Sequence, residues 1–508
     1  MPARTLMVQG TGSDVGKSVL VAALCRLFLG RGLRVAPFKA QNMSNNSFVT
    51  PDGREIGRAQ AVQAAACRLS PRSDFNPVLI KPSTECSAQL IVNGKVAGSL
   101  VASDFGRVRR ECWGQVQEAY GRLAAEFDLI ILEGAGSPAE VNLREHDIVN
   151  MRMARHAGAP VILVGDIDRG GVLAAVVGTM ALLSVEEARL VKGFVINKFR
   201  GDAGLLTPGL KVVETRTGLP CLGVLPYLRD LRLPEEDAVT WKAASRRSAD
   251  RPDVLRIGVA DVPCISNFTD LDRLRAEGDV ELVQINGTEA LLLDALILPG
   301  TKNTPQALRY LQKCRIDRLA RRILAEGGTV VGLCGGYQLL GKRILDPYQV
   351  ESTDKELKGL ELLDVETILG REKVTVQVTG IHRASGSHIE GYEVHMGRTI
   401  RDRGVEPLFD VQNFGEMDVR TEGAVSDNGR VMGTYVHGVF DSSDFRRCFL
   451  NRLRSARGWS PVEPEAETSL DRELDRWAAY VERHLNLQAL ETIIAGNGRP
   501  GGNPDILG

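Results

Sequence analysis

The chain has 508 residues, of which 43% are hydrophobic and 25% are charged. This composition is that of an ordinary globular protein, and it excludes a mostly disordered, collagen-like or fibrous chain. Its 63 Lys and Arg residues balance 64 Asp and Glu residues, so the net charge of −1 gives no bulk positive charge for binding nucleic acid. A prior of roughly 150 residues per domain predicts two to four domains.

The cysteine pattern and the absence of long apolar stretches indicate the compartment. Nine scattered cysteines without a CxxC pair predict reduced thiols, not a disulfide framework or a zinc site. No stretch approaches the ~20 apolar residues of a membrane span, and the start of the chain lacks the pattern of a secretory signal. We therefore expect a cytoplasmic protein that acts on small molecules, without membrane insertion and without a nucleic-acid partner.

Residues 1–241 alternate short apolar runs with helical patterns, as at Val19–Leu29 and Gly171–Leu183. The predicted strands are Thr5–Gln9, Arg34–Phe38, Leu129–Leu132, Val161–Val164, Gly193–Ile196 and Leu222–Leu225. Their nearly continuous apolar character is typical of parallel strands that helices cover on both faces. This part of the chain is predicted to be an α/β domain with a doubly wound parallel sheet.

Residues 242–253 are polar without an apolar period, and we interpret them as a linker. A second α/β domain is predicted at residues 254–450, with strands at Arg256–Ala260, Ala295–Leu298, Thr329–Leu333 and Val431–Val436. Residues 451–508 are predicted to hold a helix, one face of which carries Leu470, Leu474, Trp477, Val481 and Leu485. The Gly/Pro-rich end, Gly496–Gly508, is expected to be frayed.

A glycine-rich loop, Gly10-Thr-Gly-Ser-Asp-Val-Gly-Lys-Ser18, follows the first strand and opens the first helix. Backbone N–H groups in such a loop can face a phosphate, the lysine can reach the β- and γ-phosphates, and the serine hydroxyl can bind Mg²⁺. Five residues, not the usual four, separate the two outer glycines. The loop predicts an ATP site formed by Thr11, Gly12, Asp14, Gly16, Lys17 and Ser18.

Acidic and amide side chains follow two other strands of the first domain. Glu133 ends an apolar strand, and the carboxyl ends of parallel strands line the ligand crevice of such sheets. We predict that Ser18 and Glu133 hold Mg²⁺. Asp128 lies at the opposite end of that strand and is expected to be solvated. Asn197 follows another strand, where it either contacts the nucleobase as a cofactor-binding residue or forms a simple turn.

The second domain contains a G-x-nucleophile-x-G turn with cysteine as the nucleophile, Gly332-Leu-Cys334-Gly-Gly336. The glycines relieve crowding around a strained turn, and a helix N-terminus favours the reactive thiolate. Among seven histidines, His437 lies at the end of a late strand, where we predict the catalytic base. Backbone N–H groups near Gly300 and Gly335 are candidates for an oxyanion hole, although a plain turn explains Gly300 nearly as well.

An amide-forming synthetase explains why an ATP site and a thiol hydrolase site share one chain. ATP phosphorylates a carboxylate, and the thiol site releases ammonia from glutamine through a glutamyl thioester. The ammonia then attacks the acyl phosphate.

The motifs resemble known families. The first loop with Leu132–Gly136 resembles the dethiobiotin synthetase type of ATP-binding domain, and the cysteine turn with His437 resembles class I glutamine amidotransferases. Their order closely resembles the cobyric acid synthase family over about residues 5–450. The further segments that carry this resemblance are Pro37–Asn46, Glu55–Gln60 and Ile265–Asp272.

The resemblance implies the substrate. Members of this family amidate the b, d, e and g carboxylates of adenosylcobyrinic acid a,c-diamide, using one glutamine and one ATP with Mg²⁺ for each amide. It implies Cys334 as the nucleophile and His437 as the base. Glu55 becomes a third candidate ligand of Mg²⁺, and residues 37–46 with Asp147 are expected to face the corrin and phosphate side of the crevice.

One position departs from the class I pattern, and several alternatives stay open. Many class I enzymes orient the histidine with a glutamate two residues later, where this chain has Val439, so a slower glutaminase is expected.

A cobyrinic acid a,c-diamide synthase would use the same two domains. A P-loop switch ATPase of the partitioning type would carry an extra lysine where this loop has Gly12. An inactive amidotransferase domain is disfavoured because Cys334 and His437 are both present. The sequence does not predict the oligomeric state or the path of ammonia.

Overall fold

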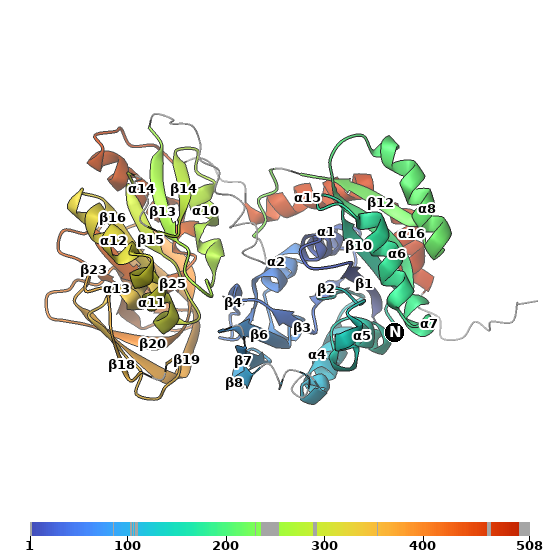
Figure 1. Cartoon of the computed structure of the whole chain (residues 1–508), viewed down its shortest axis with the longest axis horizontal. Helices are drawn as coiled ribbons and strands as arrows, with labels where there is room; N and C mark the ends of the chain where they lie inside the picture. Colours follow the sequence, from blue (N-terminus) through green and yellow to red (C-terminus); the bar gives the residue numbers. More distant parts are fainter. Residues whose placement is uncertain are drawn as a thin grey trace, which may run out of the picture.

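The computed structural model describes residues 3–496, except positions 85, 102, 103, 105, 107–109, 229, 235–252, 288–291, 353 and 465–468. The described chain forms two lobes, which Figure 1 shows side by side. The predicted linker, apart from residue 253, and the predicted tail beyond residue 496 lie outside the described residues. Within the described part, no helix combines the length and the apolar character that a bilayer span needs.

The first lobe is built around the predicted parallel sheet. Its strand order is β12-β11-β10-β1-β9-β2, so the chain starts in the middle and winds outward in both directions. The strands are β1 (Arg4–Gly10), β2 (Val35–Phe38), β9 (Leu129–Glu133), β10 (Val161–Asp166), β11 (Val191–Phe199) and β12 (Cys221–Pro226). Each strand predicted in this half of the chain is confirmed.

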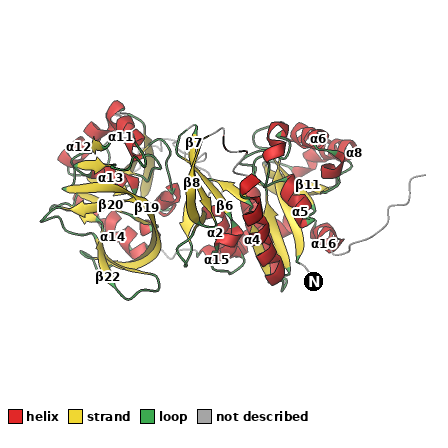
Figure 2. Ribbon diagram, turned by 90° about the horizontal axis from the view of Figure 1, so that it is seen from below, coloured by secondary structure: helices red, strands yellow, loops and turns green. Residues whose placement is uncertain are grey.

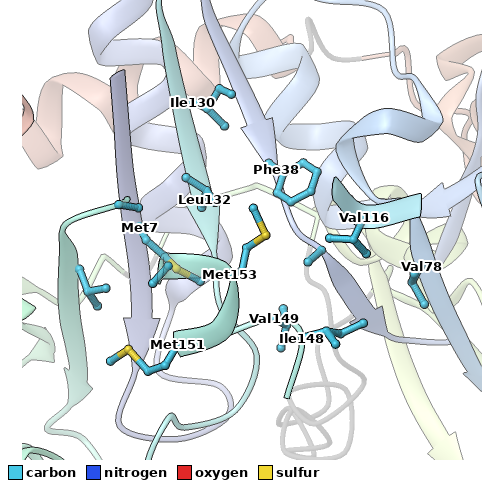
Figure 3. Close-up of a cluster of buried hydrophobic side chains, with 14 of the residues drawn as sticks. Met7, Phe38, Val78, Val116, Ile130, Leu132, Ile148, Val149, Met151 and Met153 are labelled. Atoms are coloured by element: carbon cyan, nitrogen blue, oxygen red, sulfur yellow. The ribbon is translucent and has the colours of Figure 1, made fainter. Parts of the chain in front are cut away.

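Helices cover both faces of this sheet. They are α1 (Lys17–Gly30), α2 (Arg58–Ala66), α4 (Trp113–Glu126), α5 (Met151–Ala157), α6 (Val172–Leu182), α7 (Val185–Ala188) and α8 (Thr207–Thr217). On one face, Met7, Phe38 and Leu132 of the sheet pack with Val116 of α4 and Met153 of α5, as Figure 3 shows. Alternate residues of the same strands pack against α1 and α2 on the other face. Burial on both faces accounts for the unbroken apolar runs in the sequence.

A small sheet that was not predicted is inserted between β2 and α4. Its strands are β3 (Gln41–Met43), β6 (Val78–Pro82), β7 (Ser87–Val92) and β8 (Lys95–Val101), beside the hairpin of β4 (Ser47–Val49) and β5 (Glu55–Gly57). These strands lie on the side of the first lobe that faces the second lobe (Figures 1 and 2). The insertion therefore supplies the interface between the lobes.

The second lobe contains its own mainly parallel sheet, in the order β14-β13-β15-β16-β24-β23. The strands are β13 (Leu255–Ala260), β14 (Val280–Ile285), β15 (Ala295–Leu298), β16 (Thr329–Leu333), β23 (Ala424–Val425) and β24 (Val431–Thr434). The helices are α10 (Asp272–Arg275), α11 (Thr304–Lys313), α12 (Ile316–Ala325), α13 (Gly335–Leu340) and α14 (Ser443–Ala456). The four predicted strands are confirmed, the last of them broken into β24 and β25.

A second, mostly antiparallel sheet in this lobe was not predicted. It contains β17 (Arg343–Leu345), β18 (Glu356–Lys358), β19 (Val365–His382), β20 (His388–Arg401), β21 (Phe409–Asn413), β22 (Val419–Glu422) and β25 (Val436–His437). The pairing of β20 with β25 sets Tyr392 opposite His437. This sheet therefore places one wall beside the predicted catalytic histidine.

The C-terminal helices return to the first lobe. α15 (Leu470–His484) and α16 (Leu487–Gly496) lie along α1 and β12 in Figure 1. The predicted apolar face of α15 is confirmed, since Leu474, Trp477 and Val481 are buried against α1. The Trp477 indole also donates a hydrogen bond to the Val19 carbonyl, 2.7 Å away. The predicted domain limit at residue 450 falls inside α14.

Candidate active sites

The phosphate-binding loop connects the central strand to the first helix. β1 ends at Gly10 and α1 begins at Lys17. Asp14 and Gly16 have left-handed φ values of 62° and 93°. A Cβ on Gly16 would lie 2.2 Å from the Asn197 amide nitrogen, so only glycine fits there. A tight turn at a helix N-terminus is where backbone N–H groups bind phosphate.

The Lys17 side chain folds back over this loop. Its Nζ donates to the Gly12 carbonyl at 2.8 Å and to the Gly136 carbonyl at 3.3 Å. Phosphate oxygens can replace these carbonyl partners when a nucleotide occupies the loop. The ammonium therefore lies against the loop, and its contact with the phosphates stays a prediction.

Two residues that are predicted to bind the cofactor, Thr11 and Asn197, hold the loop in place through hydrogen bonds. The Thr11 N–H donates to the Val164 carbonyl at 2.9 Å. Asn197 Nδ2 donates to the Val15 carbonyl at 2.9 Å, and Asn197 Oδ1 accepts from the Lys198 N–H at 2.8 Å. The Asn197 amide therefore helps to hold the loop, and its contact with a nucleobase stays a prediction.

Glu133 gathers three polar side chains around a buried carboxylate. Ser18 Oγ and Lys39 Nζ each lie 2.8 Å from Glu133 Oε1, and Gln63 Nε2 lies 2.5 Å from Oε2. The structure thus brings Ser18 and Glu133 together. The sequence analysis missed Lys39 and Gln63, although Lys39 belongs to the segment at residues 37–46 that carries the family resemblance. Gln63 lies in the middle of α2 and gave no signal.

The donor atoms fit a magnesium ion. The Ser18 hydroxyl and the Glu133 carboxylate are hard oxygen ligands, and Mg²⁺ usually takes one or two protein oxygens with phosphate and water completing the shell. Among the described residues, no group of three or more His, Cys, Asp or Glu side chains forms a closed metal cage. An ion bound mainly through a nucleotide is compatible with this set. Lys39 shares Oε1 and must move aside if the ion binds that oxygen.

The loop opens into a cavity of about 520 Å³, which is within the usual size range of ligand sites. The predicted residues Asp14, Gly16, Lys17 and Ser18 line it. Other lining residues come from β3, the segment after β9 and the start of α5: Gln41, Asn42, Met43, Gly136, Arg144, Asp147, Asn150 and Met151.

Asp147 has a structural part in the wall of this cavity. Its carboxylate accepts the N–H groups of Asn150 and Met151 at 3.0 and 3.1 Å, which caps the start of α5. Contact of Asp147 with a corrin or a phosphate stays a prediction.

Glu55 is part of the lobe interface, which corrects its predicted role as a metal ligand. Its Oε1 accepts from Lys81 Nζ at 2.7 Å, and its Oε2 is ion-paired with Lys373 of β19. Burial alone would raise the pKa of Glu55, but the charges of Lys373 and Lys81 hold that pKa well below its usual range. A carboxylate whose two oxygens each face an ammonium is committed to this pair of lysines. The buried charges tie the inserted sheet to the second lobe.

The cysteine turn has the strained geometry that its glycines predict. Cys334 lies between β16 and α13 with φ 50° and ψ −108°, a left-handed φ that non-glycine residues rarely adopt. A Cβ on Gly336 would lie 1.9 Å from the Leu298 carbonyl oxygen, and one on Gly332 would lie 2.6 Å from the Gly336 oxygen. Only glycines allow this close approach of backbones, which presents the thiol at the end of the sheet.

Asp270 supplies an orienting carboxylate that the sequence analysis did not find. His437 Nδ1 lies 2.7 Å from Asp270 Oδ2, and Asp270 Oδ1 accepts the Gly438 N–H at 2.9 Å. The side chains of His437 and Asp270 are 1% and 4% exposed. Although position 439 lacks the usual glutamate, His437 does have a carboxylate partner, and the slower glutaminase stays a prediction. The partner comes from 167 positions earlier and not from position 439.

The charges around His437 favour its protonated form. Burial lowers the pKa of His437, but the interactions with Asp270 and Cys334 outweigh burial and raise it to about 10. Cys334 and His437 line the same small cavity. Tyr392 stacks on the imidazole with ring centroids 5.4 Å apart. Cys334, His437 and Asp270 are arranged as a catalytic triad would require, and the roles of Cys334 as nucleophile and His437 as base stay predictions.

The predicted oxyanion region borders this triad. A Cβ on Gly300 would lie 3.5 Å from His437 Cε1, and one on Gly335 would lie 3.1 Å from the Thr301 nitrogen. The strand end at residues 300–301 therefore packs against the turn that carries Cys334. Donation of N–H groups to an oxyanion there stays a prediction.

A short 3₁₀ helix, η5 (Phe268–Leu271), connects the triad to the first lobe. The Ser47 N–H donates to Asn267 Oδ1 at 3.3 Å, and Thr269 Oγ1 donates to Asn46 Oδ1 at 3.1 Å. Asn46 and Ser47 follow β3, which lines the ATP-side cavity. The segment that carries Asp270 is thus hydrogen-bonded to a loop next to the other site.

Comparisons with known proteins match a different domain family to each of the two lobes. Residues 6–240 match the CobQ/CobB/MinD/ParA nucleotide binding domain, and residues 256–445 match the CobB/CobQ-like glutamine amidotransferase domain. A cobyric acid synthase of Syntrophobacter fumaroxidans is 45% identical over 97% of this chain and 99% of the relative. One of Pelotomaculum thermopropionicum is 48% identical over 98% of this chain and 97% of the relative.

Solved structures resemble this chain only weakly. PurLQS from Thermotoga maritima is 17% identical and covers 39% of this chain and 99% of its own, with a TM-score of 0.31. The signal recognition particle receptor FtsY from Elizabethkingia anophelis is 19% identical and covers 46% and 63%, with a TM-score of 0.27. These likenesses are too low to add to the argument.

A nucleotide-binding lobe joined to a glutamine amidotransferase lobe defines a glutamine-hydrolysing carbon–nitrogen ligase. The identity to curated relatives is high over nearly the whole length of both chains. The chain belongs to the cobyric acid synthase family.

Proposed function

We propose that this enzyme amidates the b, d, e and g carboxylates of adenosylcobyrinic acid a,c-diamide to give adenosylcobyric acid. Each amide would consume one ATP and one glutamine. The observation that carries the proposal is the near-full-length relation to cobyric acid synthases in a chain that holds both half-sites. The substrate positions come from the family resemblance.

The second lobe would supply the ammonia. The Cys334 thiolate attacks the side-chain carbonyl of glutamine, and the resulting oxyanion would be bound by N–H groups near Gly300 and Gly335. The His437 imidazolium gives its proton to the leaving nitrogen, which departs as ammonia and leaves a glutamyl thioester. His437 then takes a proton from water, which hydrolyses the thioester to glutamate and frees the thiol. The Asp270 carboxylate holds the ring in the required orientation, and the 2.7 Å contact supports this role.

The first lobe would activate the corrin carboxylate. A carboxylate oxygen attacks the γ-phosphorus of ATP, so that an acyl phosphate forms and ADP leaves. Lys17 would bind the phosphates, which its contact with the Gly12 carbonyl of the loop supports, and Lys39 shares the Glu133 carboxylate with Ser18. Mg²⁺, when bound through Ser18 and Glu133, neutralises phosphate charge. Ammonia then attacks the acyl carbon and displaces phosphate, which leaves the amide.

The direct test is a mass spectrum of the corrin after incubation with enzyme, Mg-ATP and glutamine. Each exchange of an acid for an amide lowers the mass slightly, and a ladder that ends at four exchanges would support both reaction and substrate. An unchanged corrin, with ATP and glutamine still consumed, would reject the substrate and keep the two-site reaction. The undecorated cobyrinic acid would then be the next substrate, as expected for an a,c-diamide synthase.

A further inference from the structure

The thiol of Cys334 faces a small cavity that both lobes line. The cavity has a volume of about 30 Å³, so side chains around it must move when glutamine enters. Besides Cys334 and His437, its ionisable lining residues are Lys81, Lys302, Glu351, Lys373 and His395. Under the proposed function, on which this inference rests, the side-chain amide of glutamine must reach Cys334 here. The α-carboxylate and α-ammonium of the same molecule then need partners nearby.

The three lysines of this cavity differ in their partners. Lys81 and Lys373 are both ion-paired with Glu55. Lys302, which follows the Gly300 turn at the end of β15, has no carboxylate within 4 Å and no side-chain hydrogen bond among the described residues. Burial lowers the pKa of Lys302, which means that its charge is poorly compensated in this structure. This ammonium is therefore the one available to an anionic group of a ligand.

Glu351 is the acidic counterpart in the same cavity. One of its oxygens accepts the Thr304 N–H at 3.0 Å, at the start of α11. No ion pair within 4 Å engages Glu351 in the described part of the chain, and burial raises its pKa although Lys302 pulls in the opposite direction. A molecule that carries one negative and one positive group and binds between Lys302 and Glu351 would therefore stabilise the charges of both side chains.

We infer that Lys302 binds the α-carboxylate of glutamine and Glu351 binds its α-ammonium. An α-amino acid carries one negative and one positive group on the same carbon, which matches two opposite charges that share a cavity without touching each other. The pair would select free glutamine over amides that lack either group. It would also hold the side-chain amide toward Cys334. Each contact would be a charge-assisted hydrogen bond in a site with little water.

The test compares glutamine with two truncated substrates in the glutaminase reaction. 4-Aminobutanamide lacks the α-carboxylate, and glutaramic acid lacks the α-ammonium. We expect Lys302→Met to lower kcat/KM for glutamine by roughly 10- to 100-fold, as for loss of a charged hydrogen bond. The same change should leave kcat/KM for 4-aminobutanamide nearly unaltered, because that molecule has no group for Lys302. Glu351→Gln should lower kcat/KM for glutamine and leave kcat/KM for glutaramic acid nearly unaltered, because glutaramic acid has no α-ammonium for Glu351 to bind.

Matched controls separate recognition from damage to the fold. Lys313→Met makes the same chemical change at an exposed lysine of α11 and should alter none of the three rates. Ammonia-dependent amidation and circular dichroism show whether each variant is folded. If Lys302→Met does not fold, Lys302→Gln and the independent Glu351→Gln series give the same comparison.

Two outcomes would overturn the inference, and they are distinguishable. If wild type hydrolyses glutamine but Lys302→Met slows glutamine and 4-aminobutanamide by equal factors, the assignment of the pair fails and the proposed function survives. If wild type does not hydrolyse glutamine at all, the proposed function fails and the pair loses its ligand with it.

Discussion

Replacing Asp270 with asparagine tests the triad most directly. The aspartate uses both oxygens, one for His437 Nδ1 at 2.7 Å and one for the Gly438 N–H at 2.9 Å. An asparagine of nearly the same shape has one acceptor oxygen and one amide nitrogen. It can therefore satisfy only one of the two donors, and it also removes the negative charge beside the imidazolium.

The expected loss follows from these contacts. A hydrogen bond to a charged group contributes about 1.5–3 kcal/mol, and an unsatisfied buried donor costs about 1–3 kcal/mol. If both effects fall on the transition state, glutaminase loses about 2.5–6 kcal/mol, or roughly 10²- to 10⁴-fold in rate. Since the charge of Asp270 helps to raise the pKa of His437 to about 10, the alkaline limb of the glutaminase pH profile should also move to lower pH.

The assay measures glutamate release with ATP and corrin present, beside amidation driven by ammonium salts. Asp402→Asn, the same change at a carboxylate that is 46% exposed, serves as the control. A glutaminase rate close to wild type would refute the orienting role of Asp270. So would an equal loss of ammonia-driven amidation, because that result would indicate damage to the whole enzyme.

The other predictions concern the two half-sites and the contact between them. Cys334→Ser should abolish glutamine-dependent amidation and leave the ammonia-dependent reaction, and loss of both in a rate assay would argue against its role as nucleophile. Lys17→Ala should remove amidation with either nitrogen donor, which full turnover at saturating ATP would contradict. Glu55→Gln should destabilise the protein by about 3–5 kcal/mol at neutral pH, because it leaves buried lysines without their carboxylate. Because the pKa of Glu55 is lower in the folded protein than in the unfolded chain, its carboxylate stabilises the fold at pH values above the unfolded pKa of about 4.3. In urea titrations, the difference in stability between wild type and Glu55→Gln should therefore become smaller as the pH falls below that value. We also expect glutaminase to be faster when ATP and corrin are bound, because the segment that carries Asp270 is hydrogen-bonded to the first lobe. Thr269→Val, which loses the hydrogen bond to Asn46, should reduce this stimulation, and an unchanged ratio of the rates with and without ATP and corrin would exclude this contact from the coupling.

Local patterns in the sequence predict the two parallel sheets and the turns that end them. Buried parallel strands are continuous apolar runs, and the P-loop and the turn around Cys334 need glycines at particular positions. Asp270 could not be assigned in this way, because its partner His437 is brought next to it only by the folded lobe. The ion pair of Glu55 could not be predicted either, because its partner Lys373 lies more than 300 positions later in the chain and reaches the carboxylate only in the folded protein. The long strands β19 and β20 lack the continuous apolar run of a buried parallel strand, because exposed and partly exposed residues are interspersed along both, so that pattern does not identify them.

The return of α15 and α16 to the first lobe means that the chain is not two units joined end to end. The amidotransferase lobe is enclosed, in sequence, by two pieces of the ATP-binding lobe, much like a guest domain inserted into a host. A single cut between residues 242 and 253 would leave α1 with an uncovered apolar flank, since Leu474, Trp477 and Val481 would depart with the other fragment. That fragment would carry two amphipathic helices without their partner. Gene fission into separate synthetase and glutaminase subunits would therefore need a second break after α14, or a new cover for α1.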